Sequence, residues 1–237
     1  MNKKLKIMAA GDSITCGVNG NYSYRRYLMQ SLDSILDSFD MVGSQENTVP
    51  PTCFKSAHEA FPGWKTFDFI DTQTRKLTFE SSLLHHRPTT ILLHIGSNDL
   101  LKGKQVKSIC NNITHILDSI IEIDNSTTVF VANVIPMYAK NGLERILARA
   151  LPWYVGDIYT KGEQLAYELE SIFDERYNQN IYMVDVRKQF SKTMLTRDFV
   201  HPNVKGDMHI SSTFLKEISE VYGLKNAIED DCGARGV

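Results

Sequence analysis

The stretch Leu5-Lys6-Ile7-Met8-Ala9-Ala10-Gly11-Asp12-Ser13-Ile14-Thr15 decides how this chain folds. Its first six residues form a short, mostly apolar run of the kind that builds a buried parallel strand. A Gly-Asp-Ser turn follows at once, and a helical pattern begins soon after it. In an open α/β sheet such a turn lies at the carboxyl edge, where ligands bind. The sequence therefore predicts the hydroxyl of Ser13 at the ligand-binding edge of a sheet.

Apolar runs of the same kind recur along the chain and alternate with segments of helical periodicity. Strands are predicted at residues 5–10, 39–43, 90–95, 128–134 and 181–186, and helices at residues 24–36, 106–121, 165–173 and 206–222. Alternation of this kind favours parallel strands joined by right-handed helical crossovers. We therefore expect an α/β fold, a three-layer α/β/α arrangement around a flavodoxin-like parallel five-stranded sheet.

Two segments interrupt this alternation. Residues 48–64 carry three prolines and a glycine, which indicates a long functional loop. Residues 137–157 contain an apolar stripe at 146–155, which favours a core segment, with a lid over the site as the alternative. We expect one domain over residues 1–225 and a disordered tail over residues 226–237, which are acidic and then glycine-rich.

The composition narrows the possible partners. The chain has 237 residues, 42% of them hydrophobic, and a formal net charge of −2. This charge favours neither nucleic acid nor an anionic membrane. No apolar run approaches the roughly 20 residues that cross a bilayer, so no integral membrane segment is expected. The apolar run after Lys3 and Lys4 is too short for a signal-peptide core. We expect a cytoplasmic protein, or one exported without a cleaved signal peptide.

The four cysteines have neither CxxC nor zinc-site spacing, and we expect them to be free thiols. The sequence has no GxSxG elbow, dinucleotide-binding glycine motif, phosphate-binding P-loop or HExxH motif. We therefore expect neither a metal nor a cofactor. The sequence leaves the oligomeric state open.

A serine at neutral pH is a weak nucleophile and needs a base to take its proton. The segment Asp198-Phe199-Val200-His201-Pro202-Asn203 supplies a candidate, because an aspartate three residues before a histidine can hold the imidazole in one tautomer. The proline and asparagine that follow mark a turn before the last predicted helix. Ser13, His201 and Asp198 are therefore the candidate catalytic residues.

Such a serine also needs hydrogen-bond donors for a developing oxyanion. The segment Ile95-Gly96-Ser97-Asn98-Asp99 follows a predicted strand and offers the side-chain amide of Asn98. The segment Pro62-Gly63-Trp64 offers the N–H of Gly63. Together with the N–H of Ser13, these groups would form an oxyanion hole from three loops.

Taken in their order along the chain, the Gly-Asp-Ser turn, the loop glycine Gly63, the Gly96-Ser97-Asn98-Asp99 segment and the Asp198–Pro202 segment resemble the SGNH hydrolases, also called GDSL esterases and lipases. The resemblance covers almost the whole chain, from residue 6 to about residue 215. It implies Ser13 as nucleophile, His201 as base and Asp198 as its orienting partner. It also implies Gly63 and Asn98 as oxyanion donors.

A narrower resemblance is to carbohydrate esterase family three, whose members remove acetyl groups from xylan-like polysaccharides. It rests on four segments: residues 23–27, 42–44, 58–64 and 93–99. The chain departs from that family at Phe61 and Pro62, where the family tends to have small or polar residues. The resemblance implies a short-chain acyl, chiefly acetyl, ester of a carbohydrate-like alcohol as substrate. Candidate substrate contacts are Asp12, His58, Trp64 and Trp153.

Alternatives remain open from the sequence. A lysophospholipase or thioesterase would use the same catalytic residues beside an apolar groove. A non-catalytic binding protein on this fold is the other possibility, since fold alone does not give function. Ser13 could instead cap a helix. Asp12 and Asp99 are expected to bind loop N–H groups, and His94 to be a hydrogen-bonded core histidine.

Overall fold

The computed structural model describes residues 4–17, 23–48, 55–73, 78–151, 153–154, 156–176 and 179–224. The strands are β1 (Leu5–Gly11), β2 (Phe39–Met41), β3 (Gln45–Thr48), β4 (Lys55–Ala60), β5 (Thr90–His94), β6 (Thr128–Ala132) and β7 (Ile181–Val184). The helices are α1 (Ser13–Cys16), α2 (Ser23–Ile35), α3 (Thr66–Ile70), α4 (Phe79–His86), α5 (Ser97–Leu101), α6 (Val106–Ile123), α7 (Gly142–Ala150), α8 (Asp157–Glu175) and α9 (Val204–Tyr222), with a short 3₁₀ turn at Lys192–Met194.

The strands form one mixed sheet in the order β3-β4-β1-β5-β6-β7, with β2 also paired to β1. One edge of β1 pairs in parallel with β5, and the other edge is shared between two strands. Leu5 pairs with Phe39 of β2, whereas Gly11 pairs with Ala60 of β4. The path β2-β1-β5-β6-β7 is the predicted flavodoxin-like order, and it brings the carboxyl ends of β1 and β5 side by side.

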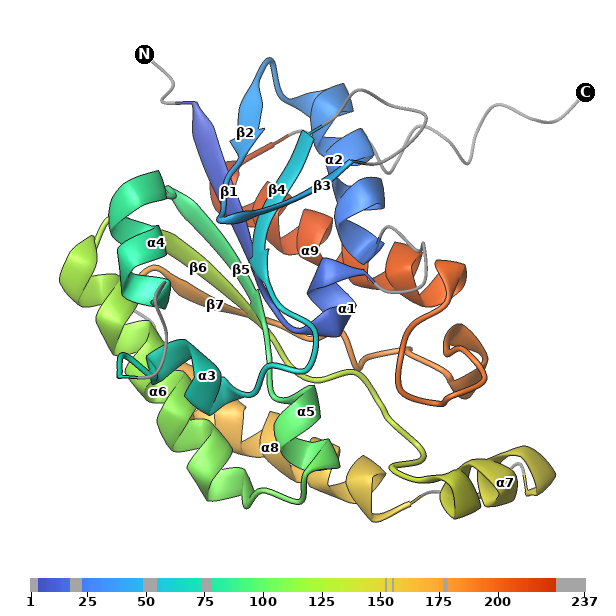
Figure 1. The fold of residues 1–237 in the computed structure, drawn as a ribbon. Coiled ribbons are helices and arrows are strands. Elements are labelled where there is room, and N and C mark those ends of the chain that lie inside the picture. Colours follow the sequence, from blue (N-terminus) through green and yellow to red (C-terminus); the bar gives the residue numbers. More distant parts are fainter. Residues whose placement is uncertain are drawn as a thin grey trace, which may run out of the picture.

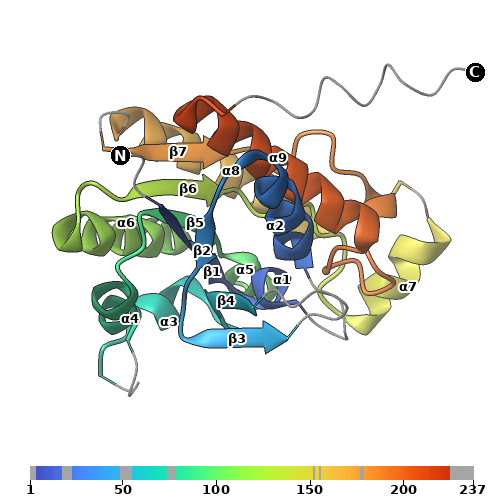
Figure 2. The same ribbon diagram turned by 90° about the horizontal axis from the view of Figure 1, so that it is seen from above.

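Within the described residues the sheet has seven strands, so the predicted count of five is too low. The two additional strands are β3 and β4, and β4 lies inside residues 48–64, where the sequence predicts a loop. Residues 55–60 instead form β4, which pairs with β1 in parallel and with β3 in the antiparallel sense (Figure 2). The apolar pattern misses β4 because polar His58 and Glu59 occupy buried positions in it. Residues 49–54 lie outside the described part of the chain.

Helices cover both faces of the sheet. Helices α2 and α9 cover one face, and α3, α4, α6 and α8 cover the other (Figure 1). Helix α6 shows why: Ile109, Ile113 and Leu117 recur at helical spacing and are all buried against the sheet. On the opposite face, Phe214 of α9 stacks on Tyr24 of α2 with ring centroids 5.3 Å apart. The three-layer prediction is confirmed.

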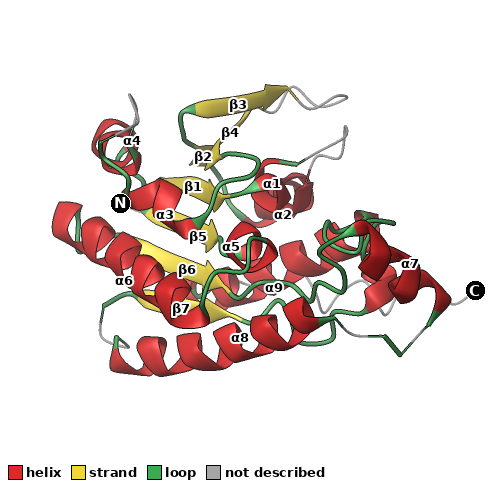
Figure 3. Ribbon diagram, turned by 60° about the horizontal axis from the view of Figure 1, so that its bottom comes forward, coloured by secondary structure: helices red, strands yellow, loops and turns green. Residues whose placement is uncertain are grey.

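The segment 137–157 contains α7, which lies beyond the edge of the sheet in Figure 3. None of the described large apolar side chains in the stripe at 146–155 is fully buried: Ile146 is 63% and Trp153 75% exposed, and Leu147, Leu151 and Tyr154 are partly buried. The prediction that this stripe belongs to the core is therefore wrong. Helix α7 has nine residues, and only Ala148 among them is buried, so little of this helix packs against the rest of the protein.

No helix in the described ranges is both long and apolar enough to span a membrane. Cys16 and Cys110 take part in no disulfide, whereas Cys53 and Cys232 lie outside those ranges. The predicted tail at residues 226–237 also lies outside them.

Candidate active site

The turn after β1 presents Ser13 at the first position of α1. Asp12 is the residue that caps this helix, since its Oδ1 atom accepts a hydrogen bond from the N–H of Ile14 at 2.9 Å. Ser13 therefore does not cap α1, and its hydroxyl points elsewhere. Asp12 is fully buried, and this burial raises the pKa of its carboxyl to about 6.

The buried side chain of Arg25, on α2, holds the far end of α1 in place. Its guanidinium donates to the carbonyl oxygens of Thr15 at 2.7 Å and Cys16 at 3.0 Å. It also donates to the carbonyl oxygen of Ser56 on β4, at 3.1 Å. Arg25 thus ties the serine turn to a neighbouring strand. This role was not predicted from the sequence, because an internal arginine bound to carbonyl groups leaves no spacing pattern.

Ser13, His201 and Asp198 form one continuous chain of hydrogen bonds. The Ser13 Oγ atom lies 2.9 Å from Nε2 of His201, and Nδ1 of His201 lies 2.7 Å from Oδ2 of Asp198. The hydrogen bond to Asp198 raises the pKa of His201, although partial burial opposes it. The side chains of His201 and Asp198 remain 26% and 31% exposed. The arrangement lets the imidazole accept the proton of the serine hydroxyl.

A tight turn fixes the carboxylate of Asp198. Its Oδ1 atom accepts from the Thr196 hydroxyl at 2.7 Å, the Val200 N–H at 2.9 Å and the His201 N–H at 3.0 Å. Burial alone would raise the pKa of Asp198, but the hydrogen bonds from His201 and these groups lower it well below its usual value. Phe199 takes a positive φ of 61° to complete the turn. The carboxylate that is hydrogen-bonded to the imidazole of His201 is therefore ionised.

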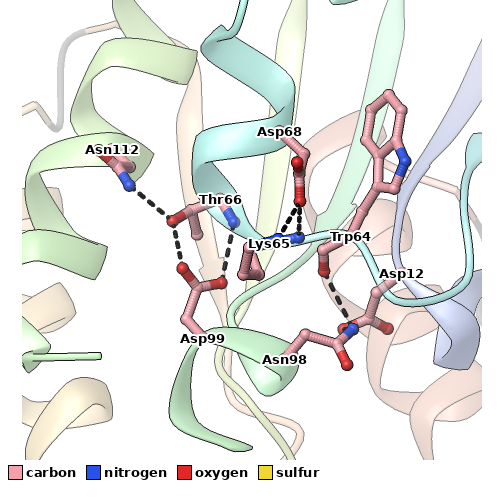
Figure 4. Close-up of polar contacts among 8 residues, drawn as sticks. All are labelled: Asp12, Trp64, Lys65, Thr66, Asp68, Asn98, Asp99 and Asn112. Atoms are coloured by element: carbon pink, nitrogen blue, oxygen red, sulfur yellow. Dashed lines mark hydrogen bonds and ion pairs between the residues drawn. The ribbon is translucent and has the colours of Figure 1, made fainter. Parts of the chain in front are cut away.

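The side chain of Asn98 lies beside this serine turn. Gly96 caps α5 with a φ of 117°, a conformation that favours glycine, and Asn98 follows in the first turn of that helix. The Asn98 Nδ2 atom donates to the carbonyl oxygen of Trp64 at 3.0 Å and lies 3.5 Å from Oδ2 of Asp12 (Figure 4). An amide nitrogen carries two hydrogens, and in this structure one is directed at Trp64 and the other, over the longer distance, at Asp12.

The turn that contains Gly63 is attached to the same edge of the sheet at both ends. The N–H of Phe61 donates to the carbonyl oxygen of Gly11 at 3.0 Å, and Trp64 is bound to Asn98. Gly63 has a φ of 84°, and the space that a Cβ atom would occupy there is open. The three segments predicted to supply oxyanion donors therefore meet at one edge.

The four candidate substrate contacts are placed very differently. Trp64 is half-buried and stacks on Phe61, with ring centroids 3.9 Å apart. Trp153 is exposed just beyond α7. Asp12 is 0% and His58 1% exposed, so neither offers surface to a substrate in this structure. The Nδ1 atom of His58 accepts the Ala60 N–H, and burial lowers the pKa of His58 to about 3.

His94, at the end of β5, is also fully buried. Its burial in the core is as predicted, but among the described residues neither ring nitrogen has a hydrogen-bond partner, so the predicted hydrogen bond is not found there. Burial lowers the pKa of His94 to about 4, which keeps the ring neutral at pH 7. Within the described residues, no group of three or more His, Cys, Asp or Glu side chains is arranged to hold a metal.

A sequence profile of the GDSL-like Lipase/Acylhydrolase family matches residues 9–208, which include all of these segments. The chain belongs to this family. The GDSL family assignment makes it a carboxylic ester hydrolase and removes the alternative of a non-catalytic binding protein. No curated protein matches the sequence.

Solved structures agree with the GDSL assignment. A family 3 carbohydrate esterase of Clostridium thermocellum is 25% identical, with a TM-score of 0.73 over 93% of this chain and 98% of that chain. A carbohydrate esterase family 3 protein from Talaromyces cellulolyticus and an acetyl esterase mutant with an acetate ion are each 20% identical. Both have a TM-score of 0.74 over 92% of this chain and 98% of theirs.

Proposed function

We propose that this GDSL hydrolase cleaves short-chain acyl esters, chiefly acetyl esters, of a carbohydrate-like alcohol through an acyl-enzyme on Ser13. The hydrogen-bonded chain from Ser13 through His201 to Asp198 is the observation that carries this proposal. A serine that is 2.9 Å from an imidazole nitrogen, with an ionised carboxylate on the other nitrogen, is arranged for nucleophilic catalysis.

In the first half of the reaction, Oγ of Ser13 attacks the carbonyl carbon of the ester while its proton passes to Nε2 of His201. The carbonyl oxygen becomes an oxyanion that accepts hydrogen bonds from the N–H groups of Ser13 and Gly63 and from the amide of Asn98. His201 then gives its proton to the departing alcohol, which leaves the acyl group on Ser13.

In the second half, His201 takes a proton from water, and the resulting hydroxide attacks the acyl carbon. Collapse of the second tetrahedral intermediate breaks the bond to Oγ, and His201 returns its proton to Ser13. The carboxylic acid is released and the enzyme is regenerated. Throughout both halves, Asp198 holds the imidazole in one tautomer and stabilises its charged form.

Asn98→Ala is expected to lower kcat by about a hundredfold or more, which corresponds to about 3 kcal/mol, with little change in KM. The amide would act mainly on the charge that develops in the transition state. The measurement is steady-state kinetics on p-nitrophenyl acetate, with Asn111→Ala, an exposed position on α6, as the matched control. An effect confined to KM would mean that Asn98 binds the substrate instead.

Support for a short acyl group comes from the structural relatives and from the loop beside Ser13. One structural relative is named an acetyl esterase and others are named family 3 carbohydrate esterases. In this chain, the stacked rings of Phe61 and Trp64 flank the turn that carries Gly63. Trp64 also packs edge-on against Phe69, with centroids 5.0 Å apart, which stiffens the loop. We infer that these rings limit the length of the acyl group.

Ester hydrolysis is therefore expected to decline steadily from acetyl to butyryl to octanoyl esters. Each added methylene that does not fit a pocket costs about 1–3 kcal/mol at most, so the preference is graded. The measurement is kcat/KM for the three p-nitrophenyl esters, followed by acetate release from acetylated xylo-oligosaccharides. A preference for octanoyl esters would contradict the short-acyl part of the proposal.

The second candidate function is that of a lysophospholipase or thioesterase. The exposed apolar side chains of the α7 region favour it: Leu143 is 68%, Ile146 63% and Trp153 75% exposed. Exposed apolar groups of this kind are able to contact a lipid chain. The same acyl series distinguishes this candidate, since it alone predicts that longer esters react faster.

A further inference from the structure

Asp99 follows Asn98 in α5, yet its carboxylate points to a different partner. Its Oδ2 atom accepts from the N–H of Thr66 at 2.8 Å, and its Oδ1 atom accepts from the Thr66 hydroxyl, also at 2.8 Å. Figure 4 shows both oxygens directed at this one residue. Asp99 was expected to bind a loop N–H, and the structure confirms this. The second bond, to the hydroxyl, makes the contact bidentate.

A third helix completes the contact. Nδ2 of Asn112, on α6, donates to Oγ1 of Thr66 at 2.9 Å (Figure 4). The Thr66 hydroxyl therefore accepts from α6 and donates to α5. Thr66 is 0% and Asp99 2% exposed, so water does not compete for these bonds. The three side chains hold the start of α3 against α5 and α6.

The position of Thr66 in the chain gives this contact its importance. Asn98 binds the carbonyl oxygen of Trp64, and Asp99 binds Thr66, two residues further on. Two adjacent residues of α5 therefore form hydrogen bonds to the segment that directly follows Gly63. One of the two, Asn98, is itself a proposed oxyanion donor, and Gly63 is another. These hydrogen bonds thus link two proposed donors that lie on different segments of the chain, the Gly63 turn and α5.

Both oxygens of Asp99 accept hydrogen bonds, which is the arrangement of a carboxylate. Burial raises the pKa of Asp99 on balance, and the N–H and hydroxyl of Thr66 oppose this rise because they stabilise the charged form. Hydrogen bonds to a charged carboxylate are about twice as strong as neutral ones. A neutral amide at position 99 would have the same shape but would turn an N–H group toward a Thr66 donor.

We propose that Asp99, Thr66 and Asn112 are positioning residues that set the distance between the Gly63 N–H and the Asn98 amide in the oxyanion hole. This inference rests on the function proposed above. None of the three side chains touches the reacting atoms. They act through the backbone of residues 63–66 and through the orientation of α5.

The test is Asp99→Asn, alone and combined with Asn98→Ala. Alone, it is expected to lower kcat on p-nitrophenyl acetate by about tenfold to a hundredfold with KM unchanged, because small misplacement of a catalytic group is costly. In the Asn98→Ala background it is expected to have a much smaller effect. If Asp99 acts through the oxyanion hole, most of its contribution is already lost with Asn98. A purely structural role would lower kcat by the same factor in both backgrounds.

The matched control is Asp68→Asn. Asp68 accepts from the N–H of Lys65 at 2.7 Å and from its Nζ at 2.8 Å, and so supports the same end of α3 through Lys65. It is expected to lower the melting temperature with kcat nearly unchanged. Equal losses of kcat in Asp68→Asn and Asp99→Asn would overturn the inference, since any loosening of α3 would then suffice.

Two variants of Thr66 keep the test decisive if Asp99→Asn does not fold. Thr66→Ser retains the hydroxyl and is expected to keep kcat within about twofold of the parent, whereas Thr66→Val loses it and should lower kcat by about tenfold. Equal kcat values for these two variants would reject the inference. The proposed function has a separate test, because an active Ser13→Ala protein would contradict it whatever the variants of Asp99 and Thr66 show.

Discussion

Ser13→Ala is expected to lower kcat for ester hydrolysis by about 10⁶-fold, down to the weak catalysis that the oxyanion donors give alone. The substitution removes the attacking oxygen and leaves the turn intact, because Asp12 rather than Ser13 caps α1. The melting temperature should therefore remain close to that of the parent. Activity on p-nitrophenyl acetate and a thermal melt measure the two effects.

The control for this variant is Ser108→Ala, which removes an exposed hydroxyl on α6. It should match the parent in both activity and melting temperature. A Ser13→Ala protein that retained more than about a hundredth of the parent activity would show that another group attacks the ester.

Asp198→Asn is expected to lower kcat by about 10⁴-fold, because an amide at this position favours the wrong tautomer of His201. The carboxylate of Asp198 accepts a hydrogen bond from Nδ1 of His201 at 2.7 Å, and three further hydrogen bonds hold it in place. Asp118→Asn, which alters a partly exposed carboxylate paired with Arg176, is the control and should retain full activity. A loss of less than tenfold in Asp198→Asn would contradict the assigned role.

The residual activity of Asp198→Asn should also show a changed pH profile. The hydrogen bond to Asp198 is the main cause that raises the pKa of His201 above its ordinary value of 6.5. Since His201 must be neutral to accept the proton of Ser13, kcat/KM should rise with pH through this raised pKa. Removing the negative charge should move the midpoint to lower pH. An unchanged midpoint would mean that another group controls the profile.

The positions of Ser13, Asn98, Asp198 and His201 follow from local sequence. Each lies just after a short apolar strand or just before a helix, and parallel strands bring such ends to one edge of the sheet. The hydrogen-bonded chain and the position of Asn98 agree with that expectation.

Other features depend on contacts between distant residues and leave no local pattern. The bond between Thr66 and Asp99 spans 33 positions, and that between Thr66 and Asn112 spans 46. Strand β4 was missed because Glu59, though buried, is polar. Its carboxylate is satisfied by the N–H of Ser44 at 2.7 Å and by the hydroxyl of Ser82 at 2.6 Å. Apolar periodicity does not detect burial that hydrogen bonds make possible.

The α7 stripe shows the opposite error. Its apolar residues have the spacing of a core helix, yet Ile146 and Trp153 are exposed, and Leu147 and Leu151 are only partly buried. The spacing of apolar residues predicts that a helix has an apolar face, but not that another element covers it. The tertiary arrangement decides this, and here α7 lies away from the sheet (Figure 1).

Labelling by a fluorophosphonate tests the central claim, that His201 activates Ser13 as the nucleophile, most directly. The serine oxygen displaces fluoride and forms a stable bond to phosphorus, so the modified residue is identified by peptide mass mapping. Ser13 should be the one residue modified in the native enzyme, and labelling should be strongly slowed in His201→Ala. A label on any other residue, or equally fast labelling of Ser13 without His201, would contradict the claim.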